Sequence, residues 1–154
     1  MSFFSALTDC FGRQSPAEDT EEASRQAASR HTVLVVDDDK EFLDSCATFL
    51  REAGYNVLKS STGSKGLNML RYAPRDISVV LLDYDMPQLN GEETLQFLHK
   101  MSLQLKVGAI SGLDESLLPA SFREHVDSFL PKPFRRDELL QFVHELLTWF
   151  NAGS

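Results

Sequence analysis

Residues 77–85 read ISVVLLDYD, an apolar run that ends in two aspartates, Asp83 and Asp85. A second apolar run, TVLVV at 32–36, is followed by three consecutive aspartates at 37–39. Short runs that are apolar throughout are typical of central strands in a parallel sheet, which are buried on both faces. We therefore expect two central strands whose carboxyl ends both carry acidic side chains.

The rest of the sequence from His31 alternates short apolar runs with longer segments of helical period. Alternation of this kind predicts right-handed crossovers and a doubly wound α/β fold, in which a parallel sheet is covered on both faces. In such open sheets, ligands bind at the carboxyl ends of the strands, where the strand order reverses. We expect five strands, at 32–36, 56–59, 77–82, 106–110 and 126–130, and five helices, at 40–53, 63–71, 91–101, 114–123 and 135–149. The second strand is more polar than the others and suits a sheet edge.

The composition narrows the class of protein. A length of 154 residues suits one domain, and a net charge of -8 argues against a nucleic-acid partner. The start is too short and polar for a signal peptide, and no apolar run is long enough for a membrane span. The two cysteines, Cys10 and Cys46, have no spacing for zinc or a disulfide framework, which fits a reducing, cytoplasmic compartment.

The N-terminal residues 1–30 differ from the rest and are expected to form a tail. Residues 12–24 are acidic and lack hydrophobic periodicity, so they are interpreted as a flexible linker. Before them, five side chains share one face at helical spacing, which leaves open a short amphipathic docking helix or a frayed end; they are Phe3, Phe4, Leu7, Cys10 and Phe11. The domain is expected at 31–150, with a C-terminal tail at 151–154. Because no effector domain follows the last helix, output is expected by contact with another protein.

Carboxylates from two strand ends should converge on one crevice. Held this close, they repel one another unless a cation neutralises them. An all-oxygen ligand set suits a hard cation such as Mg²⁺ better than zinc. Helix capping is the alternative interpretation, and it suits Asp39, which directly precedes a helix. Capping alone does not explain Asp37, Asp38 and Asp83, which lie too close to their strands.

Two further strand ends add polar groups to the same edge. Ser111 follows the fourth strand, and Lys132 follows the fifth strand between two prolines that restrict its neighbours. A carboxylate nucleophile, a metal, a hydroxyl group and an ammonium group together form a phosphoryl-transfer site. The four histidines lie away from the strand ends and receive no catalytic role; they are His31, His99, His125 and His144.

Four motifs stand in order at these strand ends: VVDD at 35–38, LDYDMP at 82–87 with Asn90-Gly91 after it, AISG at 109–112 and LPKPF at 130–134. In these motifs the sequence resembles the receiver domain of two-component response regulators, over about residues 32–150. In particular, the sequence resembles a stand-alone, chemotaxis-regulator-like receiver. This resemblance implies a flavodoxin-like fold with strand order 2-1-3-4-5.

The resemblance also implies roles for the acidic residues. Asp37 and Asp38 would hold Mg²⁺ directly or through water. Asp83 would be both the phosphoacceptor and a metal ligand, and the backbone carbonyl of Asp85 would complete the protein ligands.

Further implied roles concern the other strand ends. Ser111 would hydrogen-bond the new phosphoryl group as a switch residue, Lys132 would pair with a phosphoryl oxygen, and the Lys132-Pro133 peptide bond would be cis. Ser111 stands where threonine is more usual, and serine keeps the hydroxyl. Phe129 stands where tyrosine is more usual at the aromatic switch position, so the ring can still turn but cannot donate a hydrogen bond.

By this resemblance the protein is a phosphoacceptor signalling protein, not an enzyme, which assists its own phosphorylation and dephosphorylation. A histidine kinase or histidine phosphotransfer protein would act upstream and an effector protein downstream, and phosphorylation-dependent dimerisation stays open. One alternative is a receiver-like adaptor that is never phosphorylated. Another is a haloacid-dehalogenase-like phosphatase, since Asp83-Tyr84-Asp85 fits its Asp-x-Asp pattern. Those phosphatases draw further acids from later in the chain, whereas here the acidic pair precedes Asp83.

Overall fold

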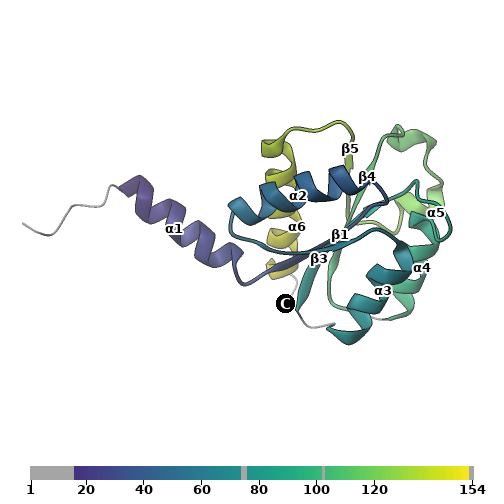
Figure 1. The fold of residues 1–154 in the computed structure, drawn as a ribbon, viewed down its shortest axis with the longest axis horizontal. Coiled ribbons are helices and arrows are strands. Elements are labelled where there is room, and N and C mark those ends of the chain that lie inside the picture. The colour runs from purple at the N-terminus through teal and green to yellow at the C-terminus, as the bar shows by residue number, and fades with distance from the viewer. Residues whose placement is uncertain (1–15, 74–75, 102, 153–154) are drawn as a thin grey trace, which may run out of the picture.

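The computed structural model describes residues 16–73, 76–101 and 103–152. In this part of the chain five parallel strands form one sheet in the order β2-β1-β3-β4-β5, as expected (Figure 1). The more polar β2 is an edge strand, in agreement with its sequence. The strands are β1 Thr32–Val36, β2 Asn56–Ser60, β3 Ile77–Asp83, β4 Lys106–Ser111 and β5 Ser128–Pro131.

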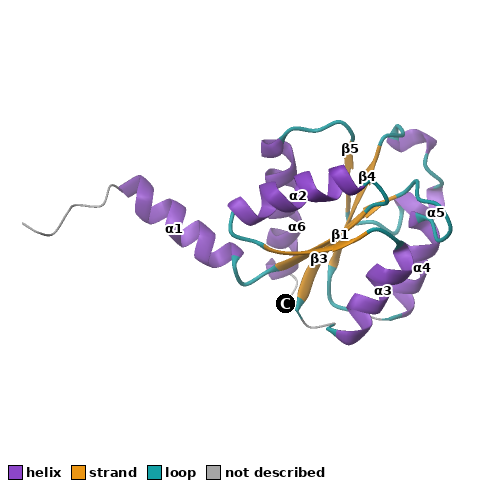
Figure 2. Ribbon diagram, in the orientation of Figure 1, coloured by secondary structure: helices purple, strands orange, loops and turns teal. Residues whose placement is uncertain are grey.

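Helices cover both faces of the sheet and give three layers (Figure 2). Helices α2 (Lys40–Glu52) and α6 (Arg136–Ala152) enclose one hydrophobic cluster. Helices α3 (Gly63–Tyr72), α4 (Gly91–Lys100) and α5 (Ala120–Arg123) enclose the other. Successive side chains of a strand point to opposite faces. The alternate residues of β1 therefore enter different clusters, which explains why this strand is apolar throughout.

The register of the sheet brings the polar strand ends together. Val36 at the end of β1 pairs with Leu82 of β3, so the aspartates that follow lie side by side. Asp83 pairs with Ile110 of β4, and Ser111 pairs with Pro131 of β5. The carboxyl ends of four strands thus meet at one edge.

The prediction of one continuous helix at 114–123 is wrong. The structure has a 3₁₀ turn at Glu115–Leu117 and a short α5 after it. Pro119 separates the two, with Leu118 in an extended conformation (φ -75°, ψ 144°). Proline disfavours helical backbone at the preceding residue and cannot donate a backbone hydrogen bond, so it divides the segment.

The prediction of a flexible linker at 12–24 is also wrong for residues 16–24, which the structure describes. They belong to helix α1, Pro16–Ala28. The described chain therefore has six α-helices instead of the expected five. The segment is rich in alanine and glutamate, which favour helix, and proline is favoured in a first helical turn. It lacks an apolar stripe because α1 extends away from the domain (Figure 1). The amphipathic helix considered for residues 1–11 lies outside the described residues.

The base of α1 packs on the domain. Ala28 is buried, and Asn56 Nδ2 donates a hydrogen bond of 2.8 Å to the Ser29 carbonyl. Gly54 has a φ of 98°, and a β-carbon there would lie 3.0 Å from the Arg25 carbonyl oxygen. These contacts fix the end of α1 that is nearest to the sheet. No described helix is both long and apolar enough to cross a membrane.

Helix α4 begins directly against the end of β3. Asn90 caps the helix and forms a capping box with Glu93. The Gly91 amide donates a hydrogen bond of 3.0 Å to the Tyr84 carbonyl. A β-carbon on Gly91 would lie 2.5 Å from the Asp83 carbonyl oxygen and 2.6 Å from Tyr84 Cα. Because both neighbours are backbone atoms, they cannot move aside cheaply.

We predict that Gly91→Ala destabilises the protein by about 1–3 kcal/mol, because the added methyl group overpacks this junction. Equilibrium urea unfolding measures the change. Gly112→Ala is the matched control, since a β-carbon there has no neighbour within 4 Å. Equal stability of the two variants would contradict the prediction.

Candidate functional site

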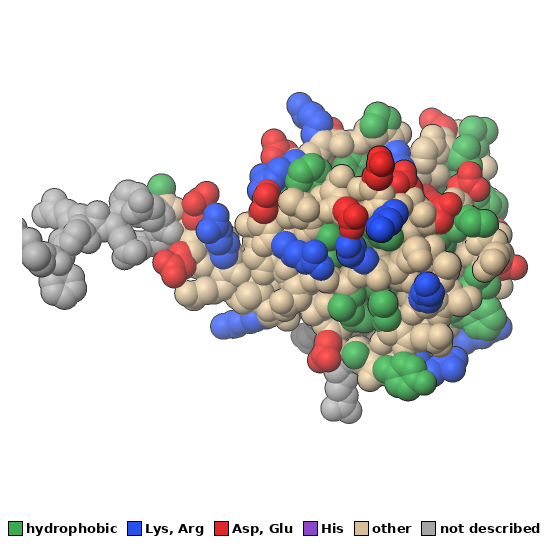
Figure 3. Space-filling model, viewed as in Figure 1, with side chains coloured by type: hydrophobic (Ala, Val, Ile, Leu, Met, Phe, Trp, Pro, Cys, Tyr) green, Lys and Arg blue, Asp and Glu red, His purple; other side chains and the backbone are tan. Residues whose placement is uncertain are grey.

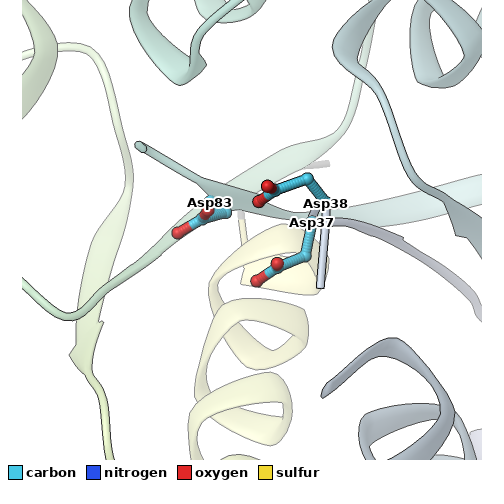
Figure 4. A group of neighbouring side chains, drawn as sticks. All are labelled: Asp37, Asp38 and Asp83. Carbon is cyan, nitrogen blue, oxygen red and sulfur yellow. The ribbon is translucent and has the colours of Figure 1, made fainter. Parts of the chain in front are cut away.

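Three carboxylates lie side by side at the ends of β1 and β3 (Figure 4). Asp37 and Asp38 follow β1, and Asp83 is the last residue of β3. Each can offer an oxygen atom such that all three atoms lie within 4.8 Å of one another. Asp37 and Asp83 are only 1% and 5% exposed, whereas Asp38 is open to solvent. The cluster is therefore buried on one side and accessible on the other.

Lys132 brings a positive charge to the two buried carboxylates. Its Nζ lies 2.6 Å from Asp37 Oδ2 and 3.5 Å from Asp83 Oδ1. The backbone amide of Lys132 donates a hydrogen bond of 2.8 Å to the Ser111 carbonyl, and the Lys132–Pro133 peptide bond is cis. The lysine that follows β5 thus contacts the ends of three other strands.

An aromatic ring also contacts the Lys132 ammonium group. Nζ lies 4.0 Å from the centroid of the Phe42 ring, within the range of a cation–π interaction. The Phe134 ring packs edge-on against Phe42, with centroids 5.6 Å apart. Sequence reasoning missed Phe42. The signal was available in Asp39, which is the N-cap of α2 as expected and accepts a hydrogen bond from the Phe42 amide, so that Phe42 lies in the first helical turn beside the strand ends.

The electrostatics of the cluster leave an excess of negative charge. Burial and, next, the negative charge of Asp37 raise the pKa of Asp83 to about 7, and the opposing effect of Lys132 only limits this rise. Burial by itself would lower the pKa of Lys132, but the hydrogen bond to Asp37 and the charge of Asp83 outweigh it and raise this pKa. Lys132 is therefore charged at neutral pH, and one ammonium group faces three carboxyl groups.

The ligand set fits a hard divalent cation. Carboxylate oxygens are the donors that Mg²⁺ prefers, and Mg²⁺ usually keeps several waters, which the exposed side of the cluster can supply. The raised pKa of Asp83 has the same implication, because a cation beside the carboxylate would favour its ionised form. The residues present thus fit magnesium.

The other residues expected at the site lie around this cluster. Ser111 is fully buried, and its Oγ accepts a hydrogen bond of 3.0 Å from the Leu113 amide. Phe129 is partly buried on β5, paired with Ala109, and packs against the cluster under α3, α4 and α5. The Asp85 side chain is exposed and outside the carboxylate group. The structure therefore joins Asp37, Asp38, Asp83 and Lys132 directly and places Ser111 at the same edge.

Comparison with protein families matches residues 33–144 to the model of the response regulator receiver domain. Two curated relatives are similar over much of this chain. A putative transcriptional regulator of Haloferax volcanii is 30% identical over 136 residues, covering 86% of this chain and 22% of the relative. The response regulator SaeR of Staphylococcus aureus is 27% identical over 125 residues, covering 75% of this chain and 50% of the relative. The chain spans half or less of the length of these relatives.

Solved structures share the fold. A putative two-component system response regulator/GGDEF domain protein superimposes with a TM-score of 0.76 at 27% identity, covering 83% of this chain and 53% of that one. A CheY-like response regulator receiver domain protein from Methanospirillum hungatei gives a TM-score of 0.69 at 22% identity, covering 80% of this chain and 98% of that one. The latter similarity concerns the fold alone.

We predict that Asp83→Asn stabilises the metal-free protein more at pH 8 than at pH 4.5. The folded-state pKa of about 7 lies above the unfolded value of 3.8. The contribution of Asp83 to stability is therefore present below about pH 4 and is lost as the pH rises through 7. Asparagine is neutral throughout, so the stability difference should grow over this range by about 2 kcal/mol, allowing for solvent screening. Urea unfolding in a chelator measures it. A difference independent of pH would refute this account.

We also predict that millimolar Mg²⁺ raises the melting temperature of the wild type by several degrees, because it binds only the folded cluster. Asp38→Ala should lose most of this rise, since it removes one of three carboxylates. Asp44→Ala, an exposed aspartate on α2 that pairs with Lys59, serves as the matched control and should keep the rise. A wild-type melting temperature that does not change on addition of Mg²⁺ would count against the metal site.

Proposed function

The chain belongs to the response-regulator receiver family, and on that premise we propose that Asp83 accepts a phosphoryl group in a Mg²⁺-dependent reaction. Receiver domains are signalling modules of two-component systems. The observation that carries the proposal is the contact of Lys132 with Asp37 and Asp83 inside a cluster of three carboxylates. This cluster combines a nucleophile, a cation site and a fixed positive charge within one crevice.

The proposed ligands of the metal are Asp37, Asp38 and Asp83, together with the backbone carbonyl of Asp85. When bound, Mg²⁺ would offset the charge of the incoming phosphoryl oxygens. Asp39 supports this arrangement, because its amide donates a hydrogen bond of 2.9 Å to Asp37 Oδ1. That bond fixes the orientation of the Asp37 side chain. The other carboxylate oxygen, Oδ2, then accepts a hydrogen bond from Lys132 Nζ.

The nucleophile of the proposed reaction is a carboxylate oxygen of Asp83. It attacks the phosphorus atom of a phosphohistidine; a new P–O bond forms, the P–N bond breaks, and the leaving imidazole takes up a proton. With a pKa of about 7, Asp83 is only partly ionised at neutral pH without a cation. A neighbouring cation increases the ionised fraction, so the metal requirement follows from the burial of the nucleophile.

We propose that Lys132 pairs with an oxygen of the new acyl phosphate and that Ser111 reports its presence. The Ser111 hydroxyl accepts a hydrogen bond from Leu113 and can donate one of its own to a phosphoryl oxygen. Phe129 lies beside Ala109, two residues before Ser111 on the same face of β4. In the proposed switch the Phe129 ring would turn past the small Ala109 side chain as Ser111 shifts. This movement would alter the surface formed by α5, β5 and α6.

The proposed partners are a histidine kinase or phosphotransfer protein upstream and an effector protein downstream, in the cytoplasm. Leu113 and Leu117, in the segment after β4, are exposed apolar side chains that a partner could cover. Acidic and basic side chains are interspersed on the face of the domain in Figure 3, without a basic stripe. Phosphorylation-dependent dimerisation and assistance by the protein in its own dephosphorylation belong to the same proposal.

For the domain organisation we propose a receiver domain at 31–150 with residues 1–30 as an appendage. The contacts at the base of α1 support a boundary close to Ser29, since the Asn56 side chain is bonded to its carbonyl. The phosphatase alternative finds no support in the family assignment. The acidic pair Asp37 and Asp38 also follows β1 and so precedes Asp83 in the chain, whereas those phosphatases draw further acids from later in the chain. The adaptor alternative is separated from the switch by the following experiment.

We predict that the full-length protein incorporates one phosphoryl group from a small-molecule phosphodonor in the presence of Mg²⁺. Asp83→Asn should lose labelling because it lacks the nucleophile, whereas Asp85→Asn should keep it, because the backbone carbonyl is unchanged. Ser111→Ala should be labelled, but chemical shift changes on adding beryllofluoride should then stay near Asp83 and not reach Phe129. Mass spectrometry and nuclear magnetic resonance measure the two effects.

Three results would count against this function. Absence of labelling in the wild type would favour the adaptor. Labelling of Asp83→Asn would show that another residue is the acceptor. Sustained phosphate release from many substrates would favour a phosphatase.

A further inference from the structure

Two imidazole rings face each other on the side of the domain covered by α4 and α5. His99 lies in the last turn of α4, and His125 follows α5. Their ring centroids are 5.1 Å apart, with an angle of 56° between the planes. His99 lies eight positions after Gly91, which is at the carboxylate edge, and this corresponds to a rise of about 12 Å along α4. The pair is therefore distinct from the site around Asp83.

The tautomer of the neutral His125 ring is set by its neighbour. His125 Nδ1 lies 2.6 Å from the backbone carbonyl oxygen of Ser121. A carbonyl oxygen can only accept, so Nδ1 carries the hydrogen and Nε2 of the neutral ring keeps a free electron pair. A histidine that donates one ring N–H to a backbone carbonyl is in the arrangement commonly seen for metal-binding imidazoles.

A surface pocket of about 380 Å³ gives access to both rings. Glu92 and Ser121 also line it, and the Ser121 hydroxyl donates a hydrogen bond to the Glu92 carboxylate. Lys100 also lines the pocket, and its Nζ lies 5.3 Å from the centroid of the Phe97 ring. The pocket thus combines two nitrogen donors with a carboxylate whose charge favours a cation.

We propose that His99 and His125 bind a divalent transition-metal ion, such as Zn²⁺ or Ni²⁺, which bridges α4 and the end of α5. With metal–nitrogen bonds of 2.0–2.1 Å and a tetrahedral angle, two imidazole centroids lie about 5 Å apart. The observed centroid separation of 5.1 Å matches this spacing. Water completes the coordination, and the negative charge of Glu92 adds long-range attraction.

The donor types separate this site from the carboxylate cluster. Imidazole suits zinc, nickel and copper, whereas carboxylate oxygens suit magnesium. Excess Mg²⁺ therefore occupies the cluster around Asp83 and leaves the histidine pair available. The proposal is independent of phosphoryl transfer, since neither histidine belongs to that site.

The test uses the untagged full-length protein in millimolar Mg²⁺, titrated with Ni²⁺. We expect one Ni²⁺ per chain, paramagnetic broadening of the His99 and His125 ring signals, and a rise in melting temperature of about 5 °C near saturation. His99→Ala and His125→Ala should each weaken Ni²⁺ binding by about tenfold or more and lose most of that rise. His144→Ala, at an exposed histidine on α6 outside this pocket, is the matched control and should behave as the wild type.

A second variant guards against loss of structure. His125→Gln can still donate a hydrogen bond to the Ser121 carbonyl but is a poor ligand for Ni²⁺, so it should fold and lose metal binding. Equal Ni²⁺ affinity in the wild type and the His99 and His125 variants would overturn the proposal. So would loss of binding in Asp38→Ala in place of the histidine variants, or no broadening of either ring at millimolar Ni²⁺.

Discussion

Repulsion among carboxylates at one edge of the sheet is the constraint on which the rest of the structure depends. Asp37 and Asp83 are almost completely buried and neighbour each other because β1 and β3 pair in register. Such an arrangement costs free energy, and the hydrophobic core offsets it. Each apolar side chain buried in the two central strands contributes about 1.5–3 kcal/mol. Burial of the apolar strands thus stabilises the fold enough to hold the acidic residues that follow them close together.

Lys132 links the carboxylates to the remainder of the edge. Its ammonium group contacts Asp37, Asp83 and the Phe42 ring, while its backbone amide is bonded to the Ser111 carbonyl. A new charge on Asp83 would therefore act on a group that is already shared among β1, α2 and β4. Lys132 thus gives the proposed switch a physical connection between the acceptor Asp83 and Ser111. Its side chain contacts Asp83 at the end of β3, and its backbone amide is bonded to Ser111 at the end of β4.

Much of this could be predicted from the sequence. The alternation of apolar runs and helical segments predicted the parallel sheet and the convergence of its strand ends, and the resemblance to receiver domains implied the strand order. The apolar runs before Asp37 and Asp83 identified the central strands, and the motifs placed the polar residues. Helix α1 was missed because its exposed face has no hydrophobic period, although its composition favours helix. The break at Pro119 was available in the sequence and was overlooked. By contrast, the packing of Phe42 on Lys132 and the raised pKa of Asp83 depend on burial and on contacts between distant residues, which no local pattern contains.

Helix α1 contacts the domain through the residues of its last turns, around Arg25, Ala28 and Ser29. Its 13 residues span about 20 Å as a helix, and about 43 Å if fully extended. A helix of this length is marginally stable alone in water. The length of this segment is therefore set by its helical state, because the same 13 residues would reach roughly twice as far if the helix unwound.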